Sequence, residues 1–455
     1  MKPTLICFLL AACFSVASGE ELPTTPYEQS KLGLRYAKGE GVAKDPVQAV
    51  HWYRKAADQG FAWAQLNLGI CLVRGDGVPQ DQVQAVGWFR KAADLGDANA
   101  QANLAICLAQ GDGVPQDQVQ AVGWYRKAAD QGLVIAQLNL GHCFFHGNGV
   151  PKDEAQAVNW YRKAADQGDD SAQVILGFCF SRGIGVPKDA PQAVAWYRKA
   201  ADQGNPGAQF NLGVCFEKGE GVTKDAVLAI HWYRKAAEQG HADAQLNLGI
   251  LYGQGDGISQ DKVKAASWYR KAADQGMALA QLNLGVCYQK GEGLAKDDVQ
   301  AVFWYRKAAD QGMALAQFNL GVCYQKGEGL AKDDVQAVSW YRKAADQGMA
   351  LAQFNLGVCY RKGVGLTKDD VQAVFWYRKA ADQGEVSAQF NLAVSYLNGH
   401  GNPRNPVLAH MWFELAAAQG SEDAANLRDT MKLSPAEKAE SKRLTREWRP
   451  IKASE

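Results

Sequence analysis

The sequence lacks an excess of charge of either sign, and beyond its first residues it lacks a long apolar run. Lysine and arginine number 49 against 48 for aspartate and glutamate, so no overall basic field exists to attract nucleic acid or an anionic membrane. After residue 19, no segment has the ~20 apolar residues that are needed to span a bilayer. We therefore expect no nucleic-acid partner and no membrane-spanning segment in the body of the chain.

The sequence also lacks a unique set of catalytic side chains. Apparent Ser/His/Asp or Cys/His partners recur in every repeat, whereas an active site needs one singular arrangement. The pair Gly291 and Gly293 follows a helical pattern instead of a strand, which argues against a phosphate-binding loop. His142 and His146 have a spacing that can hold a metal, but no third ligand accompanies them, and surface substitution explains them better. We predict no catalysis, no cofactor and no metal.

The N-terminal residues 1–19 have the pattern of a secretory signal peptide. A short basic start precedes an apolar run over residues 5–16, and small residues lead to a cleavage site after Gly19. In an alternative interpretation, residues 10–13 resemble a bacterial lipobox, whose cysteine, Cys13, would carry a lipid. An uncleaved anchor is a third possibility. The expected location is periplasmic or secreted, with an outer-membrane lipoprotein as the alternative.

One motif is abundant, Trp-Tyr-Arg-Lys-Ala-Ala-Asp-Gln-Gly, read first at residues 52–60, and it returns every thirty-six residues. Its first residue keeps this spacing at Trp52, Trp88, Trp124, Trp160, Trp196, Trp232, Trp268, Trp304, Trp340, Trp376 and Trp412. A fixed period of this length indicates a solenoid, in which each unit packs only on its neighbours.

We divide the chain into a signal peptide (1–19), a linker (20–24), a repeat array (25–420) and C-terminal capping helices (421–455). The eleven units of the array are 25–60, 61–96, 97–132, 133–168, 169–204, 205–240, 241–276, 277–312, 313–348, 349–384 and 385–420. In the last segment, residues 434–437 have the pattern of a capping box that opens a charged final helix.

Each unit is predicted to hold two helices. In the second unit the first helix spans residues 61–74, with Ala64, Leu68 and Leu72 on an apolar stripe of helical period, and it ends at Gly75. The second helix is expected to begin with a capping box of Asp81 as N-cap and Gln84, and to end at Gly96. Its expected apolar face comprises Val83, Ala85, Trp88, Phe89 and Ala92.

Four recurring segments carry a family resemblance: Ala-Gln-x-Asn-Leu-Gly-x-x-Tyr, Gly-x-Gly-Val, Asp-x-x-x-Ala-Val-x-Trp-Tyr and Ala-Ala-x-x-Gly. Over residues 25–420 the chain resembles the Sel1-like repeat (SLR) family, which is related to the tetratricopeptide repeat. The resemblance implies an all-α, right-handed superhelix of antiparallel helix pairs that binds proteins, often in bacterial envelope assembly, signalling or host contact.

Eight cysteines occupy one register of the first helix, at Cys71, Cys107, Cys143, Cys179, Cys215, Cys287, Cys323 and Cys359. Equivalent helices of adjacent units should lie ~8–10 Å apart, beyond the ~7 Å that a disulfide allows between Cα atoms. We therefore expect unpaired thiols in the core.

A secreted branch of the family pairs two cysteines within each repeat, and some of its members are described as penicillin-binding or β-lactamase-like. This sequence has one cysteine per repeat and so departs from that pattern.

The units differ mostly in the first helix, at the registers of Trp63, Leu66, Ile70, Val73 and Arg74, which by analogy with tetratricopeptide repeats would line the concave side. The predicted partner-binding residues are Lys38, Trp63, Arg74, Phe145, His146, Phe178, Arg182, Lys218, Lys290, Lys326 and Lys362. A competing explanation of the basic residues is that cations in a last helical turn offset the helix dipole.

The sequence thus predicts a non-enzymatic scaffold that binds a protein or peptide, with acidic segments as the candidate contacts, on the concave face of its first helices. Aromatic and arginine side chains are the usual anchors of such surfaces. One alternative is a protein that binds or hydrolyses cell-wall fragments or β-lactams, as the secreted relatives suggest. Another is an inert spacer. The sequence makes no prediction about the oligomeric state.

Overall fold

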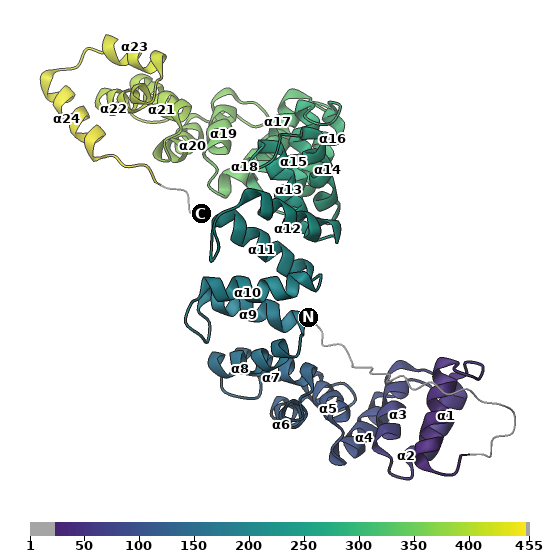
Figure 1. The fold of residues 1–455 in the computed structure, drawn as a ribbon. Helices are drawn as coiled ribbons and strands as arrows, with labels where there is room; N and C mark the ends of the chain where they lie inside the picture. Colours follow the sequence, from purple (N-terminus) through teal and green to yellow (C-terminus); the bar gives the residue numbers. More distant parts are fainter. Residues whose placement is uncertain (1–22, 452–455) are drawn as a thin grey trace. The chain divides into compact units, whose positions relative to one another are not determined.

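The protein is an all-helical solenoid in the computed structural model, which describes residues 23–451. Twenty-four helices and no strand occur within this range (Figure 1). The predicted signal peptide, residues 1–19, lies outside it. No helix of residues 23–451 has the length and apolar character needed to cross a membrane.

The helices fall into two compact bodies, and the boundary between them along the chain falls within α12, Ala226–Glu238. The first body contains α1 Pro26–Lys38, α2 Pro46–Ala57, α3 Ala62–Arg74, α4 Gln82–Asp94, α5 Ala98–Gln110, α6 Gln118–Asp130, α7 Val134–His146, α8 Glu154–Asp166, α9 Asp170–Arg182, α10 Ala190–Asp202 and α11 Pro206–Lys218. The second contains α13 Ala242–Gln254, α14 Lys262–Asp274, α15 Ala278–Lys290, α16 Asp298–Asp310, α17 Ala314–Lys326, α18 Asp334–Asp346, α19 Ala350–Lys362, α20 Asp370–Asp382, α21 Val386–Asn398, α22 Pro406–Ala418, α23 Glu422–Thr430 and α24 Pro435–Glu447.

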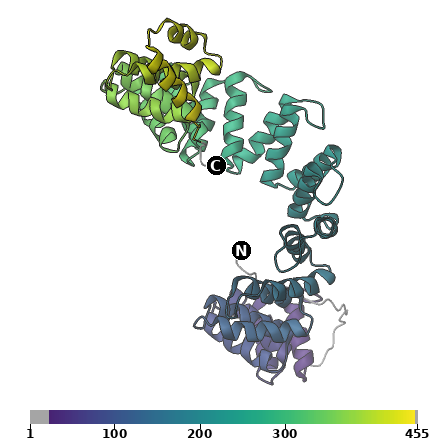
Figure 2. The same ribbon diagram turned by 90° about the vertical axis from the view of Figure 1, so that its left-hand side faces the viewer.

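From α1 to α11 and from α13 to α22, each helix packs against the next one along the chain, so helix pairs succeed one another as the sequence period predicts (Figure 2). In the second unit, Ala64, Leu68 and Leu72 of α3 are buried, as are Ala85, Phe89 and Ala92 of α4. Val83 is 69% exposed, so its assignment to the apolar face is wrong. It belongs to the first turn of α4, where the neighbouring helices do not cover it.

Glycines allow the close approach of the two helices in a unit and of one unit to the next. A Cβ on Gly69 would lie 2.5 Å from the ring of Phe89, so the first helix has no room for a side chain there. Gly77, in the turn, has φ of +72°, and a Cβ on it would lie 2.1 Å from the carbonyl oxygen of Pro46 in the preceding unit. Both positions therefore need glycine because backbone or ring atoms occupy the side-chain space.

The helix ends follow the predicted signals with one difference. Gly75 is left-handed and donates its N–H to the carbonyl of Cys71, which ends α3. Asp81 caps α4 by accepting from the backbone N–H of Gln84, but the Gln84 side chain donates to the Asp81 carboxylate instead of accepting from its backbone. The expected capping box at Asp81 is therefore wrong, because an amide nitrogen can serve the carboxylate directly.

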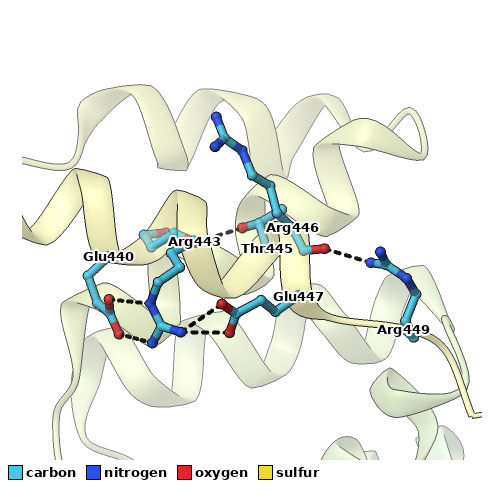
Figure 3. Close-up of polar contacts among 7 residues, drawn as sticks. Glu440, Arg443, Thr445, Arg446, Glu447 and Arg449 are labelled. Atoms are coloured by element: carbon cyan, nitrogen blue, oxygen red, sulfur yellow. Dashed lines mark hydrogen bonds and ion pairs between the residues drawn. The ribbon is translucent and has the colours of Figure 1, made fainter.

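The C-terminal end of the array is covered by α23 and α24, which both pack on α22. The box predicted at residues 434–437 is present between Ser434 and Glu437. Trp448, directly after α24, packs edge-on against Trp412 with ring centroids 6.1 Å apart. On the outer side of α24, Arg443 bridges Glu440 and Glu447 (Figure 3). On the inner side, Leu444 packs on the core and the buried Ser441 lies 2.9 Å from His410 Nδ1. A covered inner side and a charged outer side suit a helix that ends a solenoid.

Buried glutamines join successive units. Gln101 of α5 donates to the carbonyl of Ala93 in the preceding unit at 3.2 Å, and its Oε1 accepts from Gln131 at 2.8 Å, at the end of its own unit. The carbonyl acceptors are the alanines of the recurring Ala-Ala pair. The same contacts recur in most units, for example at Gln281 and Gln353. Each of these buried carboxamides thus has partners for both its N–H and its oxygen. It fixes the relative positions of three segments: its own helix, the end of the preceding unit and the end of its own unit.

The second unit lacks one member of this hydrogen-bond series. The missing residue is the glutamine at the end of the unit, such as Gln131, which we call the closing glutamine. Leu95 stands where the other units have the closing glutamine, and the Oε1 of the buried Gln65 has no hydrogen-bond partner. A buried acceptor without a partner costs roughly 1–3 kcal/mol.

We predict that Leu95→Gln stabilises the protein by about 1 kcal/mol, because the new amide can donate to Gln65 and Leu95 is itself exposed. The matched change Gln131→Leu should destabilise it by a similar amount, since it leaves Gln101 without its donor. Guanidinium unfolding followed by circular dichroism should move the two midpoints in opposite directions. Equal midpoints would refute the role given to the closing glutamine.

Seven repeat cysteines are free thiols and are buried: Cys107, Cys143, Cys179, Cys215, Cys287, Cys323 and Cys359. Burial, with a smaller contribution from Asp112, raises the pKa of Cys107 to about 12. Burial raises the pKa of Cys179 to about 11, with a smaller contribution from Glu154. At pH 8 a thiol of pKa about 11 is ionised in roughly one molecule in a thousand, and the thiolate is the reactive form.

We therefore predict that iodoacetamide at pH 8 leaves Cys107, Cys143 and Cys179 unmodified in the folded protein and modifies them fully in guanidinium. Peptide mass spectrometry measures each site separately. Rapid labelling of these three cysteines under native conditions would contradict their placement in the core.

Candidate interaction surface

The first helix of each unit exposes one line of side chains. On α15 the line comprises Leu279, Asn283, Val286 and Lys290, whose spacing of four, three and four residues places them on one side of a helix. Leu279 is 41% exposed, Lys290 is exposed, and the two residues between them are half-buried. We call this line, with the equivalent positions of the other ten first helices, the first-helix face.

Three consecutive units present the same side chains on this face. The line on α17 comprises Leu315, Asn319, Val322 and Lys326, and that on α19 comprises Leu351, Asn355, Val358 and Lys362. Leu315 and Leu351 are 45% and 46% exposed. Sequence reasoning had not named these leucines, although they occupy the register of Trp63. Their recurrence in three near-identical units was the available signal.

The seven predicted basic residues occupy equivalent places, each being the last residue of its first helix. These residues are Lys38, Arg74, Arg182, Lys218, Lys290, Lys326 and Lys362. All are exposed except the half-buried Lys38, which pairs with Glu40 at 3.4 Å. Lys326 pairs with Glu328 at 3.6 Å, a surface contact worth about 0–1 kcal/mol. The position therefore suits both roles considered for these cations, a favourable contact with the carbonyl end of the helix and an open cationic surface.

The predicted aromatic residues lie in different surroundings. Phe178 is exposed on the first-helix face of α9. Trp63 is half-buried on α3, edge-on to Tyr53 with centroids 6.0 Å apart. Phe145 lies beside the line, against the exposed ring of His146 at 5.0 Å. Phe178 is thus the most open of the predicted aromatic contacts.

Two of the five registers expected to line the surface are closed in the second unit. Leu66 and Val73 are buried there, so the prediction that they line an open surface is wrong. In the ninth unit, Phe318 at the Leu66 register packs on Tyr341 with centroids 5.7 Å apart. These registers adjoin the second helix of the same unit, and side chains at them serve its packing.

The two histidines of α7 do lie together. Their rings stack with centroids 6.4 Å apart, and Nδ1 of His142 is 3.1 Å from the hydroxyl of Tyr161. Burial lowers the pKa of His142, and the neighbouring His146 lowers it further. Residues 23–451 contain no group of three or more His, Cys, Asp or Glu side chains that could hold a metal ion.

The second helices present a different and more uniform surface. Their lysines cover the tryptophan rings, as Lys163 does over Trp160 with Nζ 3.6 Å from the ring centroid. A row of exposed valines occupies one position near the start of these helices, at Val47, Val83, Val119, Val227, Val263, Val299, Val335 and Val371. One position of the second helices, directly before the tryptophan and exposed in most units, also differs between units, as Gly87 and Phe303 show. The first-helix face differs between units at each of its four positions.

Comparison with known proteins identifies the repeat. The family model for the Sel1 repeat matches eleven successive segments, at residues 29–61, 64–97, 98–133, 134–169, 170–205, 206–241, 242–277, 278–313, 314–349, 350–385 and 386–421. Each match spans one helix pair. No curated protein matches the chain.

Two solved structures are similar along much of the chain. One is c5321 of uropathogenic Escherichia coli, a protective antigen with an SLR fold. It is 39% identical, with a TM-score of 0.79, over 93% of this chain and 91% of its own. A Sel1 repeat protein of Oxalobacter formigenes is 36% identical, with a TM-score of 0.56, over 64% of this chain and 85% of its own. The period, the helix pairs and these matches agree, and the chain belongs to the Sel1 repeat family.

Proposed function

We propose that this protein is an exported scaffold that binds other proteins through its first-helix face, above all on α15, α17 and α19. Sel1 repeat proteins are generally protein-interaction scaffolds. The observation that carries the proposal is the threefold recurrence of a half-exposed leucine and an exposed lysine on one side of consecutive first helices.

The chemistry of these side chains suits a polypeptide partner that combines apolar and acidic residues. Burying a leucine fully is worth about 1.5–3 kcal/mol, so covering the exposed part of three leucines supplies a few kcal/mol. Each lysine lies eleven residues after the leucine of the same helix. The three lysines would attract acidic groups of the partner and favour partners that carry them. The line offers leucine, asparagine, valine and lysine but no nucleophile paired with a base, which favours binding over catalysis.

Export remains part of the proposal and rests on residues 1–19, which lie outside the described residues. The similar Escherichia coli protein is a protective antigen. A role in the bacterial envelope or outside the cell is compatible with that description. In this setting the first-helix face would meet envelope or extracellular proteins.

We predict that the triple variant Lys290→Glu, Lys326→Glu and Lys362→Glu loses most of its binding to acidic peptides selected on the wild type from a random phage library. Three reversed charges on one face oppose an acidic partner directly. The matched control reverses Lys296, Lys332 and Lys368, which lie in the turns of the same units beside acidic residues. It should bind as the wild type does, and both variants should keep their helicity.

Unchanged peptide binding by the first variant would refute the role of the first-helix face. An equal loss in the control would show that only the overall charge matters.

We also predict that intact-mass and N-terminal peptide analysis of the protein, expressed in a bacterium with its first residues, finds a mature chain beginning at Glu20. A chain beginning at an acylated Cys13 would support the lipoprotein alternative. An unprocessed chain beginning at Met1 would contradict export by cleavage.

A further inference from the structure

One hollow interrupts the regular first-helix face in the second body, where α13, α14 and α15 meet. Its volume is about 210 Å³. The wall contains Ala265, Val286 and Cys287, and polar groups of Gln254 and Asn283 also line it. Lys262 and Glu292 line it too, and they pair with each other at 3.3 Å. The lining is therefore apolar in part, with hydrogen-bonding groups and no net charge.

The hollow exists because a side chain is missing. Gly253 lines it, at a register that carries Gln289 in the eighth unit and Gln325 in the ninth. In those units the glutamine Oε1 accepts a hydrogen bond from the tyrosine of the second helix, at 2.8 Å from Tyr305 and 2.9 Å from Tyr341. The seventh unit has the tyrosine, Tyr269, but no glutamine to meet it.

The hydroxyl of Tyr269 consequently faces the hollow without a partner. Tyr269 is only 9% exposed, and among the described residues its hydroxyl makes no hydrogen bond. A Cβ placed on Gly253 would lie 3.4 Å from this hydroxyl oxygen, so the donor borders the vacant side-chain space. A hydroxyl donor at the edge of the hollow, with no partner in the described part of the chain, can donate to an acceptor that enters.

We propose that this hollow is a binding pocket for a glutamine side chain of a partner polypeptide, whose carboxamide oxygen accepts from Tyr269. The eighth and ninth units show how a carboxamide satisfies this tyrosine, because the first helix supplies one there. Val286 and Ala265 would contact the methylene groups of the entering side chain. The inference rests on the proposed scaffold function only for the source of the glutamine.

The arrangement also gives selectivity. A leucine fits a similar volume but leaves the tyrosine hydroxyl unpaired and now cut off from water, and such a loss discriminates strongly against the wrong group. A carboxylate would meet Glu292 at the rim as well as Lys262. A neutral carboxamide avoids the repulsion between two carboxylates and still offers an oxygen that accepts from the Tyr269 hydroxyl.

Saturation-transfer NMR on the full chain tests the pocket directly, with N-acetyl-glutamine amide as the probe and N-acetyl-leucine amide as its matched control. A compound of this size should bind with a dissociation constant of about a millimolar. The wild type should saturate the glutamine compound and give little signal for the leucine compound. Equal signals from the two compounds would overturn the proposal.

Three variants locate the binding. Tyr269→Phe removes only the hydroxyl, at a register where the chain itself has Phe89 in the second unit, and should abolish the glutamine signal without lowering the melting temperature. Gly253→Gln fills the hollow and should abolish the signal while raising the melting temperature. Gln289→Gly opens a second hollow beside Tyr305 and should about double the signal.

A glutamine signal that survives both Tyr269→Phe and Gly253→Gln would refute the pocket, and no gain in Gln289→Gly would refute the claim that the missing side chain creates it. The outcome is separable from the scaffold proposal. Suppose that the lysine reversals leave peptide binding intact, while the glutamine compound binds the wild type but neither Tyr269→Phe nor Gly253→Gln. The proposed interaction face would then be refuted and the pocket would be supported.

Discussion

The buried hydrogen bond from one unit's first-helix glutamine to the carbonyl end of the preceding unit is the interaction on which the stack depends. Gln101 illustrates it, since its amide joins the backbone of Ala93 to the side chain of Gln131. A polar group in a packed interior must keep its partners. The alanine pair, the closing glutamine and the first-helix glutamine are therefore constrained together. A second constraint is the tyrosine or phenylalanine ring of the second helix, which packs over the first-helix glycine in most units.

This constraint explains where the units are free to differ. Most positions of the recurring Trp-Tyr helix and of the turn have little freedom, because their side chains or backbone atoms touch the neighbouring helices. The position directly before the tryptophan is exposed in most units and does vary. The first-helix face touches solvent, and its residues change along the chain from Trp63 to Phe178 and then to the repeated leucines of α15, α17 and α19. The same reasoning applies at Gly253. A glycine in place of a larger side chain leaves a defined space there, and the hydroxyl of Tyr269 has no hydrogen-bond partner within the described range.

The period, the helix pairs and most helix ends could be predicted from the sequence, because glycine and aspartate at fixed spacing have local effects. Periodicity could not tell which apolar residues the neighbouring helices cover, so Val83 was wrongly placed in the core. It also could not reveal the glutamine bonds, since a polar residue in an amphipathic helix is ordinarily expected at the surface. The vacancy beside Tyr269 depends on side chains from three helices, and no single stretch of sequence displays it.

The central claim is that buried contacts between first and second helices hold the stack, while the exposed first-helix face binds. Hydroxyl-radical footprinting of the protein with a selected peptide tests this most directly, because both faces carry comparably exposed apolar side chains. Leu279, Leu315 and Leu351 lie on the first-helix face at 41–46% exposure, whereas Phe303 and Phe375 lie on second helices at 46% and 47%. The account predicts that the peptide protects the three leucines and leaves both phenylalanines as reactive as before. Protection of the phenylalanines with unprotected leucines would contradict it.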